Sequence, residues 1–411
     1  MTTRCAILLL LLATGAVTAE QPFFDTQLIF PLEHWHNHSS SLVELPNGDL
    51  FVCWYSGSGE RTADDVKVLA ARFPKGKKSW QPRYTIADTP NFPDTNPAMF
   101  VDSKKRLWLI WPVIIANRWE TALLKYRISG VGWKSDPVKW DVSDNLLFIP
   151  RNFEAKVKAA IEPRMQNRPA GRDLLELKLA YDKAGDKYFS RMGWMPRVHP
   201  LELPSGRILV PLYSDGYNFS IIAVSDDGGN TWTSSEPLVS EGGVQPSLVR
   251  RRDGTIAAYM RDNGPPPQRV QVSESRDEGI TWSPVADSEI PNPGASLETI
   301  ALRDALWLMV NNDTEKGRHS LAAWLSDDEG KTWRWKRHIE LDLREKAASS
   351  FHYPSAIQTS DGMIHVTYSY FLNHLPDGAP RKSIKHARFN AAWIKQGDSE
   401  AGRAAGRFAP N

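Results

Sequence analysis

The sequence predicts an all-β protein, a six-bladed β-propeller with a helical insertion near residues 153–190. Three observations predict this fold: a turn ending in tryptophan that recurs along the chain, short strands around Gly-containing turns between its copies, and one segment with apolar residues at helical spacing. The 411 residues would suggest two or three average domains, but a single β-architecture can use most of this length.

The recurring turn has the pattern Ser-x-Asp-x-Gly-x-Thr-Trp. Its copies end at Trp232, Trp282 and Trp333, a repeat of about 50 residues that is typical of propeller blades. The aspartate can accept backbone N–H groups inside the turn, the glycine allows a positive φ, and the tryptophan can pack beneath. A calcium loop would need further carboxylates, so each copy is interpreted as a hairpin turn.

Two degenerate copies extend the series upstream and end at Trp80 and Trp133. Since the interval from Trp133 to Trp232 is about two periods, we expect one further turn hidden between them. The count is then six turns and six blades.

The strands between these turns form strand–turn–strand units at 42–50, 201–209, 249–256 and 357–364. The exception is the region of the insertion. Residues 153–161 have helical spacing, and residues 173–180 fit either a helix or a strand. We interpret the region as an insertion that replaces part of the third blade.

Residues 1–19 have the pattern of a secretory signal peptide. Arg4 precedes an apolar run at 7–12, and small residues at 17–19 offer a cleavage site. The run is shorter than the roughly 20 residues that a membrane span requires. We therefore expect an exported protein, which is secreted, periplasmic or extracellular.

The propeller is predicted over residues 25–390, followed by a flexible tail at 396–411. Cys53 is the single cysteine left after signal removal, so no internal disulfide is expected, and its apolar neighbours predict a buried side chain. The 50 Lys and Arg residues nearly balance the 48 Asp and Glu residues, whereas a nucleic-acid-binding protein would show a basic excess. We expect a monomer with no transmembrane segment and no nucleic-acid partner.

The repeated turn is the Asp box, or BNR repeat, of bacterial and animal sialidases. On this motif the chain resembles the sialidase (neuraminidase)-like superfamily of six-bladed propellers over residues 25–390. The resemblance implies a glycoside hydrolase that acts on a carbohydrate without a cofactor or metal ion. In such enzymes three arginines hold the sugar's carboxylate, a tyrosine assisted by a glutamate is the nucleophile, and an aspartate is the acid/base. Guanidinium groups bind carboxylates through paired hydrogen bonds, and a neutral phenol does not repel the anion.

Two positions transfer well from this resemblance. Arg318, just before the last Asp box, lies where the third arginine is expected, and Tyr353 lies where the nucleophile is expected. The second arginine is either Arg261 or Arg269, which flank the segment before the second box.

Three positions depart from the family pattern. The place of the first arginine reads His-Asn-His-Ser-Ser-Ser at 36–41, and the glutamate that usually supports this arginine is replaced by Ser369. Losing both members is coherent, because a buried glutamate without its arginine would be an unpaired charge. The glutamate that activates the tyrosine is replaced by Gln245. The substrate is therefore a sialic acid, another acidic sugar or a polysaccharide residue.

Several residues are candidates for the missing chemistry. His36 and His38 would bind hydroxyls or move protons if they enter the central funnel, or would be buried structural residues. The loop at 56–65 lies where sialidases carry the acid/base aspartate, so Glu60, Asp64 and Asp65 are all eligible as the general acid. Arg61 in the same loop would contact a carboxylate of the substrate or pair with a neighbouring acid.

Further polar residues recur at equivalent points of successive blades, and such points converge on the axis of a propeller. They are Asp94, Asn96, Arg197, His199, Tyr213, Asp215 and Asn218, with Trp119 as an aromatic platform for a sugar ring.

The sequence thus predicts an exported, sialidase-like glycoside hydrolase that acts on a terminal acidic or other sugar of a glycan or polysaccharide. With Tyr353 as nucleophile the reaction retains the anomeric configuration. Two carboxylates acting instead would give inversion or β-elimination. The alternative is a non-catalytic carbohydrate-binding propeller.

Overall fold

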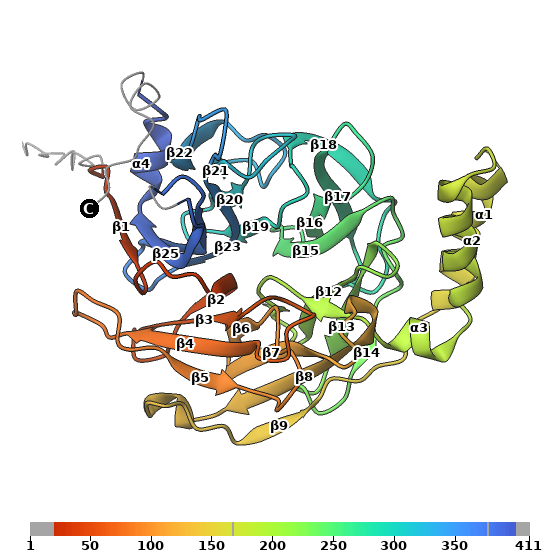
Figure 1. The fold of residues 1–411 in the computed structure, drawn as a ribbon, viewed down its shortest axis with the longest axis horizontal. Helices are drawn as coiled ribbons and strands as arrows, with labels where there is room; N and C mark the ends of the chain where they lie inside the picture. The colour runs from red at the N-terminus through yellow and green to blue at the C-terminus, as the bar shows by residue number, and fades with distance from the viewer. Residues whose placement is uncertain (1–19, 167, 376–377, 400–411) are drawn as a thin grey trace, which may run out of the picture.

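The computed structural model describes residues 20–166, 168–375 and 378–399. The predicted signal peptide at 1–19 and positions 400–411 of the predicted tail lie outside these residues. The described chain forms six sheets around one centre, as Figure 1 shows, and the predicted all-β, six-bladed propeller is confirmed. No described helix is long and apolar enough to cross a membrane.

The first three blades follow in chain order. The first contains β2 (His36–Glu44), β3 (Leu50–Gly57), β4 (Lys67–Phe73) and β5 (Tyr84–Ala87). The second contains β6 (Ala98–Val101), β7 (Leu107–Ile114), β8 (Ala122–Ser129) and β9 (Val142–Asn145). The third contains β10 (Met195–Pro196), β11 (Leu201–Glu202), β12 (Ile208–Ser214), β13 (Phe219–Ser225) and β14 (Thr233–Ser234). Short 3-10 helices lie at Trp119–Thr121 and Gly132–Lys134.

The last three blades complete the ring. The fourth contains β15 (Gly243–Arg250), β16 (Ile256–Asp262), β17 (Arg269–Ser275) and β18 (Ala286–Pro291). The fifth contains β19 (Glu298–Ala301), β20 (Trp307–Asn311), β21 (Ser320–Ser326) and β22 (Trp335–Leu341). The sixth contains β23 (Ser350–Gln358), β24 (Ile364–Leu372), β25 (Arg381–Phe389) and, from the other end of the chain, β1 (Phe24–Leu28).

The pairing of β1 with β25 closes the ring. The two strands are antiparallel, with Phe24 opposite Phe389, and they lie side by side in Figure 1. The Phe24 ring also stacks on Trp393 of helix α4 (Ala391–Lys395), with 4.4 Å between ring centroids. The sixth blade is thus built from both ends of the described chain.

The expectation of a hidden turn between Trp133 and Trp232 is wrong, although the count of six blades is right. Trp80, Trp133 and Trp232 lie in the first, second and third blades. The sixth blade has no such turn, because its outer strand β1 comes from the opposite end of the chain. The extra length between Trp133 and Trp232 is the helical insertion.

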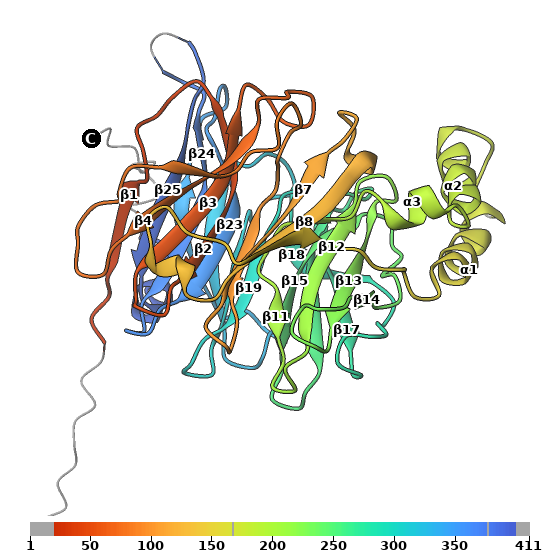
Figure 2. The same ribbon diagram turned by 90° about the horizontal axis from the view of Figure 1, so that it is seen from below.

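The insertion contains α1 (Phe153–Gln166), α2 (Arg172–Lys183) and α3 (Lys187–Arg191), which lie outside the ring in Figures 1 and 2. Helix α1 buries Phe153, Val157 and Ile161, four residues apart in turn, so one face packs on the third blade. The segment 173–180, left open between helix and strand, is helical. The third blade keeps a full sheet, so the insertion precedes this blade and does not replace part of it.

The Asp-box turns have the predicted hydrogen bonding. In the third box the Asp328 carboxylate accepts bonds from the Ser326 hydroxyl at 2.8 Å and from the backbone N–H and hydroxyl of Thr332 at 2.8 and 2.6 Å. Burial acts to raise the pKa of Asp328, but these bonds outweigh it and lower the pKa to about 2. The ionised turn therefore persists at every physiological pH.

Burial of Cys53 and polar contacts at the end of the described chain bear on two further predictions. Cys53 is buried in β3, as predicted, and burial raises the pKa of its thiol. At the start of the predicted flexible tail, Asp398 accepts a bond from the His338 backbone and pairs with the His338 ring at 2.5 Å. Gln396 accepts a bond from Arg337 at 2.9 Å. Gln396 and Asp398 are therefore bound to the fifth blade.

Two adjacent aspartates test the Asp box. Asp328→Ala removes three hydrogen bonds of the turn and is expected to lower the melting temperature by about 3 °C. Asp327→Ala, which removes a surface ion pair with Arg334, is expected to change it by less than about 1 °C. Differential scanning calorimetry at neutral pH compares the two, and equal effects would contradict a structural role for the box.

Candidate active site

A polar cavity of about 430 Å³ lies where the inner ends of the blades meet. All six blades contribute to its lining. The lining residues are His38, Tyr55, Glu60, Asn96, Trp119, Tyr213, Asp215, Asn218, Gln245, Arg261, Asn263, Arg318 and Tyr353. Most of these residues were singled out from the sequence. Tyr55 and Asn263 were not: Tyr55 lies in an uninterrupted apolar run at 50–55, and Asn263 directly follows the end of a strand.

Three lining residues share one backbone device. Asn96, Gln245 and Tyr353 each precede a proline and have left-handed φ values of 40°, 56° and 58°. Proline disfavours the right-handed helical region for the residue before it, and a left-handed non-glycine residue costs roughly 1–3 kcal/mol. The strands β15 and β23 have a register shift at Gln245 and Tyr353. These bulges break the alternation of the inner strands at the points where side chains reach the cavity.

The hydroxyl of Tyr353 lies between two donors. It accepts a hydrogen bond from Arg261 Nη1 at 2.8 Å and one from Gln245 Nε2 at 3.2 Å. The ring packs beside His38, with 4.2 Å between centroids, and the Arg318 guanidinium lies 5.5 Å from its centroid. Both donors would stabilise negative charge on the phenolic oxygen.

Three cationic groups at or near this cavity have no acidic partner in the part of the chain that the structure describes. Arg61, Arg261 and Arg318 form no ion pair within 4 Å among the described residues. Arg318 donates to the Gly294 carbonyl at 2.8 Å, and Arg61 lies over the Trp119 ring at 5.3 Å. Burial lowers the pKa of Arg318, and the nearby charge of Arg261 adds to this effect. Uncompensated guanidinium groups around a cavity are suited to an anionic ligand.

Arg61 lies outside the cavity lining, and so do two further candidate arginines. Arg269 pairs with Glu315 at 2.5 Å and does not line the cavity. The sequence left Arg261 and Arg269 open as the second arginine, and Arg261 is the one that reaches the cavity. Arg197 is buried beneath the Tyr353 ring, 4.8 Å from its centroid, where it donates to the carbonyls of Ser40 and Pro354. It therefore supports the tyrosine from below and ties together two inner strands.

The segment at 36–41 replaces the family's first arginine, and Ser369 replaces the glutamate that supports it. The two replacements are in contact in the structure. His38 Nδ1 and the Ser369 hydroxyl are 2.7 Å apart. Burial, followed by the charge of neighbouring groups, lowers the pKa of His38 well below its usual value, so this histidine is neutral at physiological pH. A neutral pair thus occupies the place of an ion pair, and His38 faces the cavity as an uncharged hydrogen-bonding group.

Glu60 is the carboxylate of the 56–65 loop that lines the cavity. Its Oε1 accepts bonds from His36 Nε2 and the Tyr55 hydroxyl, each at 3.0 Å, and Lys382 donates to His36 Nδ1 at 2.9 Å. Because an ammonium group can only donate, His36 carries its proton on Nε2. Burial acts to raise the pKa of Glu60, but the bonds outweigh it and the pKa is lowered. Glu60 is therefore ionised, and its Oε2 accepts no hydrogen bond from the described residues.

Asp64 and Asp65, the other acids of this loop, lie outside the cavity lining. Asp64 accepts a bond from Asn117 at 3.1 Å, and Asp65 accepts bonds from the backbone and hydroxyl of Ser58. Both side chains hold the loop in shape. Of the three acids proposed from the sequence, Glu60 alone reaches the cavity.

Asp215 lies at the rim of the cavity, and its pKa is shifted in the opposite direction from that of Glu60. Solvent reaches the residue, yet protein surrounds it closely in the hollow, and this desolvation raises the pKa of its carboxyl. The charges of Arg261 and Arg61 act to lower the pKa, but they do not offset desolvation. The cavity thus contains one carboxyl shifted toward the protonated form and one held ionised, a division typical of acid–base pairs.

Other polar residues that the sequence assigned to this mouth have structural partners. Asp94 accepts a bond from the Trp111 indole at 2.6 Å, and His199 pairs with the buried Glu298 at 2.5 Å. Asn96 donates to the Tyr213 hydroxyl at 3.3 Å inside the cavity. No group of three or more His, Cys, Asp or Glu residues in the described chain is arranged to hold a metal ion.

Comparisons with known proteins agree with this architecture. A model of the BNR repeat-like domain matches residues 192–366. An anhydrosialidase from Macrobdella decora is 27% identical over 186 residues, which cover 41% of this chain and 24% of that enzyme. The match therefore spans about a quarter of the length of this curated relative.

Two solved structures have the same fold over most of the chain. A protein of unknown function from Dyadobacter fermentans has a TM-score of 0.65 at 15% identity, covering 89% of this chain and 97% of that one. A sialidase from Streptococcus pneumoniae has a TM-score of 0.65 at 12% identity, covering 90% and 71%. Together with the family model, these likenesses show a sialidase-like propeller with BNR repeats.

The unpaired guanidinium groups lead to a stability prediction. Arg318→Met removes a partly buried charge repelled by Arg261 and is expected to raise the melting temperature of the ligand-free protein by about 2 °C. Arg269→Met breaks an ion pair and is the matched control, expected to lower the melting temperature or leave it unchanged. Thermal unfolding measures both, and a clear loss of stability in Arg318→Met would contradict an uncompensated charge.

Proposed function

We propose that this protein is an exported, exo-acting glycoside hydrolase that removes a terminal acidic sugar from a glycan or polysaccharide. The observation that carries the proposal is the placement of Tyr353 among guanidinium groups that have no acidic partner in the described chain, in a cavity that also holds a carboxyl of raised pKa. Arg61, Arg261 and Arg318 supply the positive charge that a sugar carboxylate would neutralise. The signal-peptide pattern at 1–19 supports export.

In this proposal Tyr353 is the nucleophile. Its oxygen forms a bond to the anomeric carbon while the bond to the leaving oxygen breaks, and Asp215 gives its proton to that oxygen. The phenolic proton passes to the ionised Glu60, directly or through water. Water then attacks the anomeric carbon and the glycosyl–tyrosine bond breaks: Asp215 takes a proton from the water, and Glu60 returns its proton to the phenolic oxygen of Tyr353. Both residues regain their starting forms, and the anomeric configuration is retained.

The donors at Tyr353 distinguish this mechanism from one with a glutamate at the phenol. Gln245 cannot accept the phenolic proton through the nitrogen that contacts Tyr353, and it donates a hydrogen bond instead. Arg261 donates at the same oxygen. Negative charge on the attacking oxygen is thus stabilised by two fixed donors, while proton removal falls to a separate group.

A second candidate function is a carbohydrate-binding propeller without turnover. One specific observation favours it: no carboxylate of the described residues is hydrogen-bonded to the Tyr353 hydroxyl. The same cavity, guanidinium groups and Trp119 platform would then hold an acidic sugar without activating a nucleophile.

Replacing Tyr353 separates these two functions. If the protein is an enzyme, Tyr353→Phe should lower kcat at least about 100-fold on 4-methylumbelliferyl glycosides of acidic sugars, while calorimetry still detects binding of the free sugar. Tyr259→Phe, at a tyrosine outside the cavity whose hydroxyl donates to the Gly330 carbonyl, is the matched control with near-normal activity. Sugar binding without turnover in the unmodified protein would favour the binding function.

The opposite pKa shifts of Asp215 and Glu60 predict a pH profile. Asp215 donates a proton only in its protonated form, so kcat/KM should fall as pH rises through its raised pKa. Glu60 acts in its ionised form, so kcat/KM should also fall as pH drops through its lowered pKa. The expected optimum is therefore acidic.

Asp215→Asn should remove the alkaline limb and lower kcat/KM about 100-fold, with a larger loss for a sugar leaving group than for 4-methylumbelliferone, which leaves without a proton. Profiles of kcat/KM against pH for the two substrates provide the measurement. Asp64→Asn is the control and should leave the alkaline limb of the kcat/KM profile in place. If Asp64→Asn removed this limb, Asp64 would be the general acid instead of Asp215.

A further inference from the structure

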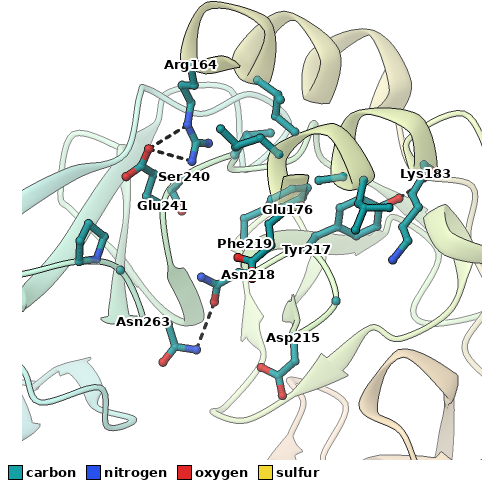
Figure 3. Close-up of a pocket in the computed structure, with 18 of the residues that line it drawn as sticks. Arg164, Glu176, Lys183, Asp215, Tyr217, Asn218, Phe219, Ser240, Glu241 and Asn263 are labelled. Carbon is teal, nitrogen blue, oxygen red and sulfur yellow. Dashed lines mark hydrogen bonds and ion pairs between the residues drawn. The ribbon is translucent and has the colours of Figure 1, made fainter. Parts of the chain in front are cut away.

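A second cavity lies directly beside the central one, between the helical insertion and the third and fourth blades. Its volume is about 670 Å³, which is within the roughly 300–1,000 Å³ of pockets that hold small organic ligands. Asp215, Asn218 and Asn263 line both cavities. Figure 3 shows these three residues below the helices, and Asp215 is the one drawn farthest from the helices. The two cavities are therefore neighbours that share one wall.

The outer wall of this second cavity is fixed to the blades at two points. Tyr217 donates from its hydroxyl to the Lys183 carbonyl at the end of α2, at 3.0 Å. Arg164 of α1 and Arg168 both contact the Glu241 carboxylate at 2.9 Å, and Figure 3 shows the Arg164 pair. Each helix is thus fixed to the blades near its C-terminal end, which holds the outer wall in one place, as a preformed binding site requires.

The lining of this cavity has the mixed chemistry that sugars require. Leu179, which is 46% exposed, offers apolar surface, while Asn263 donates to Asn218 at 3.2 Å and each amide keeps further donors and acceptors. Lys183 forms no ion pair within 4 Å among the described residues, and its ammonium lies over the Phe189 ring at 4.7 Å. Apolar side chains, amides and a cation can bind the apolar faces, hydroxyls and acidic groups of a saccharide.

The insertion also contributes nothing to closure of the ring. The third blade has its full sheet without the helices, and β1 with β25 closes the propeller elsewhere. What the insertion adds to the surface is the outer wall of this cavity. The cavity lies next to Asp215, the residue that gives its proton to the leaving oxygen in the proposed mechanism.

We infer that the cavity between the insertion and the third and fourth blades binds the sugar units next to the scissile bond, so that the preferred substrate is an oligosaccharide. The inference rests on the proposed function, in which the central cavity holds the terminal acidic sugar. The leaving part of the substrate then passes Asp215 and lies along Asn218 and Asn263 under α2. Specificity for the leaving group is a property of the insertion.

Two leucines one turn apart on α2 provide matched variants. Leu179 lines the cavity and is 46% exposed, and Leu175 lies outside the lining and is 57% exposed, so both sites can accept a larger side chain. Leu179→Trp should fill part of the cavity and Leu175→Trp should not. Neither residue takes part in the central cavity.

The substrates are 3′-sialyllactose and a trisaccharide ending in glucuronic acid, each compared with the 4-methylumbelliferyl glycoside of its terminal sugar. For whichever terminal sugar the protein hydrolyses, Leu179→Trp should lower kcat/KM for the trisaccharide about tenfold. It should change kcat/KM for the aryl glycoside of the same sugar less than about twofold. Leu175→Trp should change neither by more than about twofold. If Leu179→Trp changed kcat/KM equally for a trisaccharide and for the aryl glycoside of the same sugar, the inference would be overturned and the proposed function would stay intact.

Binding to the Tyr353→Phe protein, measured by calorimetry, gives a readout that does not depend on turnover. Each trisaccharide should bind at least about tenfold more tightly than its free terminal sugar, and Leu179→Trp should remove this difference. Tighter trisaccharide binding without hydrolysis by the unmodified protein would contradict the proposed function alone. If neither trisaccharide binds more tightly than its terminal sugar, the inference is overturned.

Discussion

Strand β1 is hydrogen-bonded along its length to β25, and this pairing joins the two ends of the described chain within one blade. Every other feature of the site depends on it, because inner strands converge on a common axis only when the ring is closed. Tyr353 on the sixth blade and His38 on the first are separated by most of the sequence, yet their rings are in contact. Arg197 reinforces the junction by donating to carbonyls of both inner strands.

The fold could be predicted because the Asp box is local chemistry. A carboxylate, a glycine and a tryptophan within eight residues are sufficient to define a turn, and the turns repeat at the length of a blade. The position of the sixth blade could not be predicted in the same way. Its outer strand comes from the N-terminal side and has no turn of this type, so the long interval before Trp232 was assigned to a hidden turn.

The site was only partly predictable, for a physical reason. Family positions identified Arg318 and Tyr353, and both reach the cavity. Arg261 and Arg269 were indistinguishable in the sequence, because which of them reaches the axis depends on strand register, which β-bulges alter. The choice among Glu60, Asp64 and Asp65 depended on a loop whose shape is set by Asn117 and Ser58. Asp215 acquires its raised pKa from surroundings contributed by several blades, which no short motif records.

The left-handed residues before Pro97, Pro246 and Pro354 have one more consequence. The backbone determines where Asn96, Gln245 and Tyr353 enter the cavity, and the strain of this geometry does not depend strongly on which polar side chain is attached. Exchanging an amide for a carboxylate at such a point changes the chemistry of the cavity without requiring a new main-chain path. Propellers with this arrangement can therefore diverge in what they do to a sugar while their architecture stays constant.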